Sequence, residues 1–92
     1  MDIKHRENDS RGMFFAEDEK GIYAELTYTK KQDVLTIDHT EVRPELEGQG
    51  IATKLLAHSV EFARENNYKI DPLCPFAEVQ FDRNESYKDV RI

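Results

Sequence analysis

Hydrophobic and polar positions alternate along the first half of the chain, as they do in β-strands that bury one face. The alternation is clearest over residues 22–29 and is also present over residues 12–16. Gly21 and the polar residues 30–33 mark the turns before and after residues 22–29. With a further strand over residues 34–42, the pattern predicts an antiparallel meander. It leaves His5 outside the strands, in a mobile terminal segment.

The strand expected over residues 34–42 has an irregular pattern. Leu35, Ile37 and His39 share one face, but Val42 falls on the opposite parity. A β-bulge near residues 39–41 would return Val42 to the inner face, splay this strand from a neighbour and free backbone groups for a ligand. The alternative is that Val42 packs outside the sheet.

After residue 44 the pattern becomes helical. Residues 50–66 carry a broad apolar face that suits packing on a sheet, and Asn66-Asn67 supplies a helix stop. Because a helix intervenes, residues 68–73 are expected to form a strand parallel to the third strand. Two short helices are expected from residue 75 onward. The predicted fold is α/β of the α+β type, a strand meander that continues into one β-α-β unit with a central helix and a short C-terminal helix.

Composition narrows the possible functions. A length of 92 residues fits a single domain over residues 1–92, and the net charge of -6 argues against a nucleic-acid partner. No apolar run approaches the ~20 residues of a membrane span, so no membrane partner and a cytoplasmic location are expected. Cys74 is the only cysteine, which excludes an internal disulfide and a four-thiolate zinc site within one chain. We expect a monomer without a metal.

The junction before the helix is the most informative part of the chain. Gly48 and Gly50 let the backbone turn tightly and approach a ligand, and the helix start presents unpaired N–H groups with a positive dipole end. This arrangement predicts a pyrophosphate site. A P-loop is absent, because Thr53 stands where its second glycine belongs, and a dinucleotide fingerprint would follow repeated βαβ units instead of a meander. A connector without any ligand is the remaining alternative.

The glycines are part of a longer segment that resembles a known sequence motif. Residues 42–56 resemble the acetyl-CoA-binding motif of the GCN5-related N-acetyltransferase (GNAT) superfamily, although Glu45 replaces the Gln or Arg that the superfamily favours. The motifs that look like its small, stand-alone branch are His39-Thr40-x-Val42, Gly48-Gln49-Gly50-Ile51-Ala52, Pro72-x-Cys74-Pro75-Phe76 and Arg83-Asn84-x-x-Tyr87. The resemblance implies a minimal GNAT-like fold without the early helices that form a substrate wall in larger relatives. It also implies acetyl-CoA as co-substrate.

The resemblance and the loop together predict a set of site residues. The cofactor is expected on Val42, Gly48, Gln49, Gly50, Ile51, Ala52 and Thr53. Cys74 and His39 are the candidates for catalysis, because both fall near the carboxyl ends of neighbouring parallel strands. Cys74 is interpreted as a nucleophile, a hydrogen-bond donor to the coenzyme A sulfur or a buried small hydrophobe, and His39 as a base or a strand histidine bonded to backbone.

Three functions are compatible with these residues. The first is acetyl transfer from acetyl-CoA to an amine acceptor, either a small molecule or a protein. The second is a non-catalytic module that binds coenzyme A or senses acetyl-CoA. The third is a protein-interaction domain that binds no coenzyme A at all.

Overall fold

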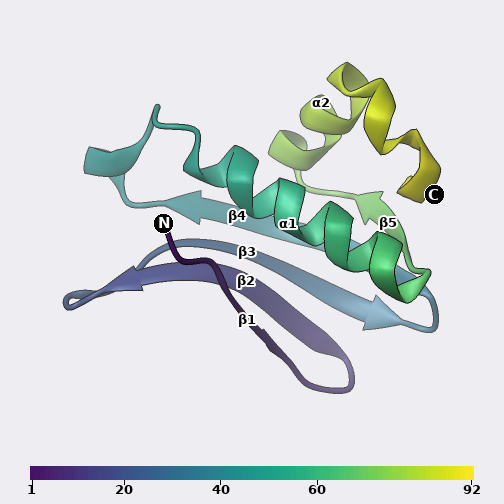
Figure 1. Ribbon diagram of the computed structural model, residues 1–92, viewed down its shortest axis with the longest axis horizontal. Helices are drawn as coiled ribbons and strands as arrows, with labels where there is room; N and C mark the ends of the chain where they lie inside the picture. Colours follow the sequence, from purple (N-terminus) through teal and green to yellow (C-terminus); the bar gives the residue numbers. More distant parts are fainter.

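A computed structural model describes residues 1–92, which form one five-stranded sheet with helices on one of its sides (Figure 1). The strands follow one another across the sheet in chain order, and all neighbours are antiparallel except the parallel pair β4 and β5. The elements are β1 (Lys4–Glu7), β2 (Arg11–Asp18), β3 (Gly21–Lys31), β4 (Val34–Val42), η1 (Pro44–Leu46), α1 (Ile51–Asn66), β5 (Lys69–Pro72), α2 (Pro75–Arg83) and η2 (Glu85–Val90). The predicted meander and β-α-β unit are confirmed.

Helix α1 crosses one face of the sheet and buries the apolar stripe that its sequence predicted (Figure 1). It ends at Asn67, whose left-handed conformation (φ 59°) lets its N–H reach the carbonyls of Ala63 and Arg64. Helices α1 and α2 share a core with the sheet through residues such as Leu26, Ile37 and Phe81. The opposite face of the sheet carries no helix.

The strand β1 was not predicted. Its sequence, Lys-His-Arg-Glu, is entirely polar and therefore shows no alternation of apolar residues. Pairing with β2, with Lys4 opposite Phe15 and Glu7 opposite Gly12, nevertheless orders it as an edge strand. Its charged side chains suit an edge that must not pair with other chains.

His5 is part of this sheet, so the expectation of a mobile terminal segment at this residue is wrong. Its ring stacks on Phe14 at 4.1 Å and meets Phe62 of α1 edge-on at 4.6 Å. Its Nε2 lies 2.6 Å from the Tyr28 hydroxyl, which donates to Glu7 at 2.7 Å. His5 keeps much of its surface exposed, yet the burial that it does undergo lowers its pKa, and burial also raises the pKa of Tyr28.

The predicted β-bulge is present in β4, one residue earlier than expected. Thr27 of β3 pairs with His39 and Tyr28 pairs with Ile37, so Asp38 is the extra residue. The bulge returns Val42 to the inner face, where it is half-buried, lies opposite Ala24 and packs against the core. The expectation that His39 shares a face with Leu35 and Ile37 is wrong, because the parity changes before His39 and not after it.

None of the helices has both the length and the apolar composition needed to span a membrane.

Candidate functional site

The loop between β4 and α1 directs a continuous series of backbone donors into open space. Gly48 (φ 82°) and Gly50 (φ 77°) both adopt the left-handed conformation, which orients the chain into the first turn of α1. The N–H groups of residues 48–53 find no acceptor in the protein, since the first helix-start donor with a backbone partner is Lys54, which bonds to Gly50. No side chain caps α1 either. These donors and the positive end of the helix dipole form a cradle for an anion such as a phosphate.

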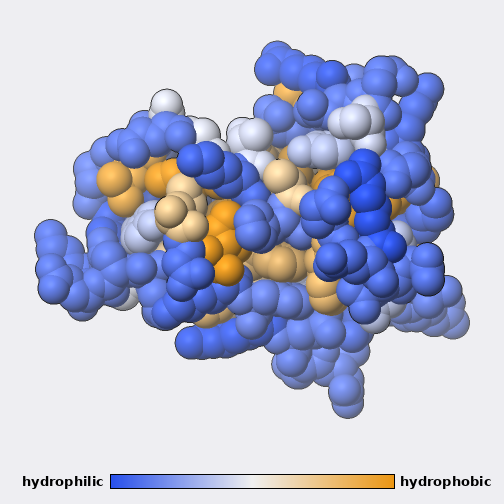
Figure 2. Space-filling view, viewed as in Figure 1, coloured by the Kyte–Doolittle hydropathy of each residue, from blue (hydrophilic) through white to orange (hydrophobic).

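A hollow of 320 Å³ adjoins these donors. Most of the predicted cofactor residues line it, and the full lining is Thr40, Glu41, Val42, Leu46, Glu47, Gly48, Gly50, Ile51, Ala52, Thr53 and Phe76. Gln49 is the one predicted cofactor residue outside the lining. Figure 2 shows apolar surface on this side of the molecule, on the left beside the loop that precedes α1 and the N-terminus. The lining holds two carboxylates and no Lys or Arg, so an anion bound here depends on backbone N–H groups.

Beyond the bulge, β4 has no neighbour on one side. The pairing of β4 with β5 ends at Ile37 and Pro72, and the chain then turns away, with the Cys74 N–H bonded to the Ile37 carbonyl. On the other side β4 continues beside β3, and Arg43 N–H bonds to Tyr23. Because backbone groups alternate in direction along a strand, Thr40 and Val42 direct theirs away from β3, toward the gap. The predicted splay is therefore present, and an extended ligand arm can hydrogen-bond to it.

Cys74 lies behind this hollow at the start of α2. The residue is only 6% exposed and does not line the hollow, but its Sγ lies 3.9 Å from the hydroxyl oxygen of Thr40, a residue that does line it. Sγ also accepts the N–H of Ala77 at 3.4 Å and so serves as the N-cap of α2, followed by Pro75 at the first helical position. Cys74 is thus a structural cap that touches the candidate site.

His39 and Cys74 are not brought together. His39 stands on the helix-free face of the sheet, half exposed, with Nε2 3.2 Å from Glu41. Thr40 takes the inward place beside Cys74 that the sequence interpretation had given to His39. The physical reason is the position of the bulge, since a shift of one residue reverses every side chain that follows.

Thr40, Leu46 and Phe76 are site residues that sequence reasoning did not assign. Thr40 and Phe76 belong to the motifs that resemble the small branch of the superfamily, but the resemblance assigned no role to either. The signal for Thr40 was its spacing of two residues from Val42, because both must share a face in a regular strand. Leu46 had no signal beyond its place in the loop.

The capping role of Cys74 predicts how the thiol contributes to stability. Replacing it with Ala removes the acceptor for the Ala77 N–H, so Cys74→Ala is expected to lower the free energy of unfolding by about 1 kcal/mol. Cys74→Ser retains an acceptor and is expected to stay close to the wild type. Thermal unfolding followed by circular dichroism measures both. Equal stability of the Ala and Ser variants would show that the sulfur does not act as a cap.

No group of three or more His, Cys, Asp or Glu side chains is arranged to hold a metal ion.

Comparison with known proteins identifies the family. The family model described as GCN5-related N-acetyltransferase matches residues 13–90, and the chain therefore belongs to this family. Among curated proteins, none matches the chain in sequence.

Solved structures agree with the family assignment. The NMR structure of a GCN5-like candidate N-acetyltransferase from Staphylococcus aureus is 40% identical, with a TM-score of 0.75 over 97% of this chain and 87% of that one. The ribosomal-protein-S18-alanine N-acetyltransferase of Escherichia coli has the same fold at 15% identity, with a TM-score of 0.66 over 84% of this chain and 52% of that one.

A relative with a bound cofactor has also been solved. A candidate streptothricin acetyltransferase from Bacillus anthracis, in complex with acetyl coenzyme A, is 17% identical, with a TM-score of 0.60 over 83% of this chain and 46% of that one. At this identity the likeness establishes the fold alone. This chain spans most of the S. aureus protein but only about half of these larger acetyltransferases.

Proposed function

We propose that this protein binds acetyl-CoA between the loop before α1 and the end of β4, and transfers its acetyl group to an amine. The observation that carries the proposal is the run of N–H groups over residues 48–53 without an acceptor in the protein. Most of these residues are exposed, so their N–H groups are open to a ligand, and a diphosphate at a helix start supplies acceptors for several of them together. Membership in an acetyltransferase family supports the same cofactor.

The rest of the cofactor fits the hollow by its chemistry. The pantetheine arm contains amide groups, which match the unpaired backbone groups of Thr40 and Val42, and its apolar carbons match Leu46, Ile51 and Phe76. The arm would then lead from Gly48 toward Thr40, which contacts the Cys74 thiol.

The proposed reaction is an acyl transfer and needs no oxidant or reductant. The neutral amine nitrogen attacks the thioester carbonyl, a C–N bond forms, the C–S bond breaks and coenzyme A leaves as a thiol that takes up the proton lost by the amine. The Thr40 hydroxyl, or the Cys74 thiol behind it, is suited to donate a hydrogen bond to the departing sulfur. Direct attack by Cys74 is disfavoured by its burial, which leaves 6% of the residue exposed.

The position of His39 limits the catalytic interpretation. His39 faces the opposite side of the sheet and is the candidate proton acceptor for an amine that arrives from there. Because this candidate base lies outside the hollow, a non-catalytic module that binds acetyl-CoA is the second candidate function.

A titration with acetyl-CoA and with free coenzyme A, followed by amide NMR shifts, tests the cofactor. The amides of Gly48, Gly50 and Val42 are expected to shift with both ligands, whereas Gln32, in the β3–β4 turn at the opposite end of β4, is expected to stay in place. Unmoved resonances of Gly48 and Gly50 at millimolar acetyl-CoA would overturn the proposal.

Turnover separates the enzyme from the module. Acetyl-CoA is incubated with a panel of amines, and acetylated product and acetylated Cys74 are measured by mass spectrometry for the wild type, Cys74→Ser and His39→Gln. The proposal expects product with the wild type and no acetyl on Cys74. Binding without any acetylated amine would assign the non-catalytic module instead.

A further inference from the structure

The helix-free face of the sheet carries a straight row of side chains that leads to the gap in β4. Arg6 lies directly opposite Met13, Met13 opposite Thr27, and Thr27 opposite His39. Residues paired in this way share one face, so the row crosses β1, β2, β3 and β4 in turn. Three strand spacings separate its ends, a distance of about 14 Å.

The end of the row near the gap is acidic. Glu25 and Glu41 lie directly opposite each other across β3 and β4, a like-charge pair that destabilises a sheet unless a cation lies between or beside them. Both line a hollow of 230 Å³. Arg43 lines the same hollow, but its guanidinium is engaged by Asp18 at 3.2 Å and by Glu45 at 3.9 Å.

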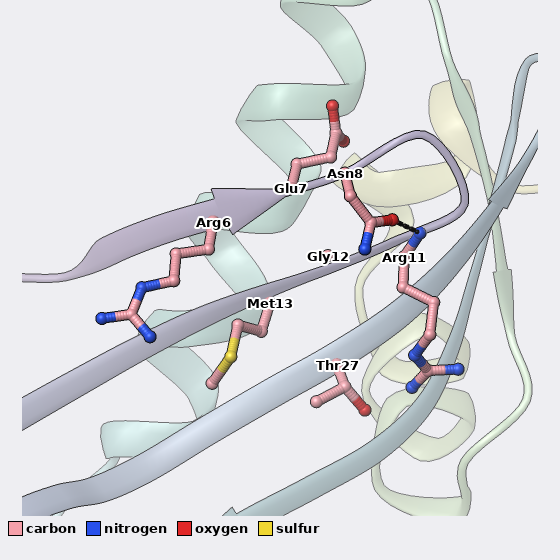
Figure 3. A pocket seen from close by; sticks show the side chains of 7 residues that line it. All are labelled: Arg6, Glu7, Asn8, Arg11, Gly12, Met13 and Thr27. Carbon is pink, nitrogen blue, oxygen red and sulfur yellow. Dashed lines mark hydrogen bonds between the residues drawn. The ribbon is translucent and has the colours of Figure 1, made fainter.

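The other end of the row is basic. A hollow of 380 Å³ is lined by Arg6 and Arg11 with Met13 between them, as Figure 3 shows. The Arg6 guanidinium lies over the Phe15 ring at 4.7 Å and forms no ion pair, and Arg11 has a single contact, with Asp38 at 3.3 Å. The carboxylate of Glu7, which also borders the hollow, is bonded to Tyr28 and Lys30 and points away from it.

One polar group of this hollow is still available. The side-chain oxygen Oδ1 of Asn8 accepts the N–H groups of Ser10 and Arg11, which holds the β1–β2 turn. The side-chain nitrogen Nδ2 of Asn8 donates to no protein group. In Figure 3 that nitrogen lies on the side of Gly12 and Arg11. Figure 3 shows the two guanidinium groups on opposite sides of Met13, so each can receive a separate carboxylate and they do not clamp a single one.

We infer that the acceptor is an elongated amine that carries carboxylate groups at its far end, bound across this row. Its cationic amine enters beside Glu25 and Glu41, gives its proton to His39 and then meets the acetyl group through the gap. One carboxylate lies on Arg6, at the far end of the row. A second lies on Arg11, where it competes with Asp38. The inference rests on the proposed acetyl transfer, because the cofactor occupies the helix side of β4 and leaves the helix-free side to the acceptor.

The length of the row sets the size of the acceptor. An extended peptide advances about 3.3–3.6 Å per residue, so about four residues connect an amine at one end of the row with a carboxylate at the other. A peptide with a free α-amino group and acidic residues at positions four and five therefore fits, and suitable probes are Ala-Ala-Ala-Glu-Glu and Ala-Ala-Ala-Gln-Gln, both amidated at the C-terminus.

The binding experiment needs no acetyl-CoA and so tests the inference separately from the proposed function. NMR titration with the two peptides is expected to shift Met13, Thr27 and Arg6 with the Glu peptide, at an affinity roughly 3- to 10-fold higher than with the Gln peptide. The difference is expected to shrink in 1 M salt, because exposed charges are screened. Equal affinities at low salt would overturn the inference.

The activity experiment adds variants with a matched control. The ratio of kcat/KM for the Glu peptide to that for the Gln peptide is expected to fall from about 10 toward 1 in the double variant Arg6→Gln, Arg11→Gln. Lys20→Gln, which removes the same charge type at the exposed β2–β3 turn, is expected to leave the ratio unchanged. An unchanged ratio in the double variant would overturn the inference.

The two failures are distinguishable. If acetyl-CoA does not shift Gly48 and Gly50, the proposed function fails, whatever the peptides do. If acetyl-CoA binds and amines are acetylated without preference for the Glu peptide, only the inference about the acceptor fails.

Discussion

Gly12→Ala is expected to destabilise the protein by about 3 kcal/mol, at the upper end of the usual cost of overpacking a core. A Cβ atom at residue 12 would lie 2.3 Å from the ring carbon Cζ of Tyr28 and 2.3 Å from its hydroxyl oxygen. The ring cannot move aside easily, because Tyr28 is fully buried and its hydroxyl is held by His5 and Glu7. For a chain of this length the melting temperature should fall by more than about 10 °C in a thermal unfolding experiment.

The background variant Tyr28→Leu provides the control. Leu has no atoms where the far end of the ring lies, so Gly12→Ala in that background should cost much less than in the wild type. A large coupling energy between the two substitutions is therefore expected from the double-mutant cycle. In a strand without a steric conflict, Gly→Ala commonly stabilises by about 0.4–1 kcal/mol, and a stabilised Gly12→Ala would contradict the described packing.

The fold was predictable wherever the sequence carries a period. The strong alternation in β3 and the apolar stripe of α1 gave the correct elements, and the parallel pairing of β5 followed from the helix before it. The polar strand β1 could not be predicted, since its order comes from backbone pairing with β2 and from the contact of His5 with Tyr28. Such tertiary contacts leave no periodic pattern in four residues.

The part of the site that consists of backbone groups could be predicted from the sequence. The side chains that lie beside the thiol could not. The glycines at 48 and 50 specified a loop of free N–H groups from residue type alone. The partner of Cys74 depended on the parity of β4, and the sequence indicated that a bulge exists without giving its residue. Placing the extra residue at Asp38 exchanges His39 for Thr40 on the inner face. A single-residue uncertainty in register therefore changes the expected chemistry beside the thiol.

Substitutions of the loop glycines test the proposed cofactor site, because they strain the backbone without adding a steric clash. A Cβ atom at Gly48 or Gly50 would meet nothing within 4 Å, so a substitution there adds no clash. It does force an L-residue to hold a positive φ, at a cost of roughly 1–2 kcal/mol. The free loop can relax to another conformation, and binding must then restore the cradle.

Gly48→Ala and Gly50→Ala are each expected to weaken acetyl-CoA binding by about tenfold, as measured by titration calorimetry. Gly21→Ala is the matched control, because Gly21 also has a positive φ (116°) and open space, but lies outside the hollow. It should leave the affinity unchanged. Because no Lys or Arg lines the hollow, the wild-type affinity should also depend only weakly on salt. Equal effects of all three substitutions would mean that the loop does not bind the cofactor through its backbone donors.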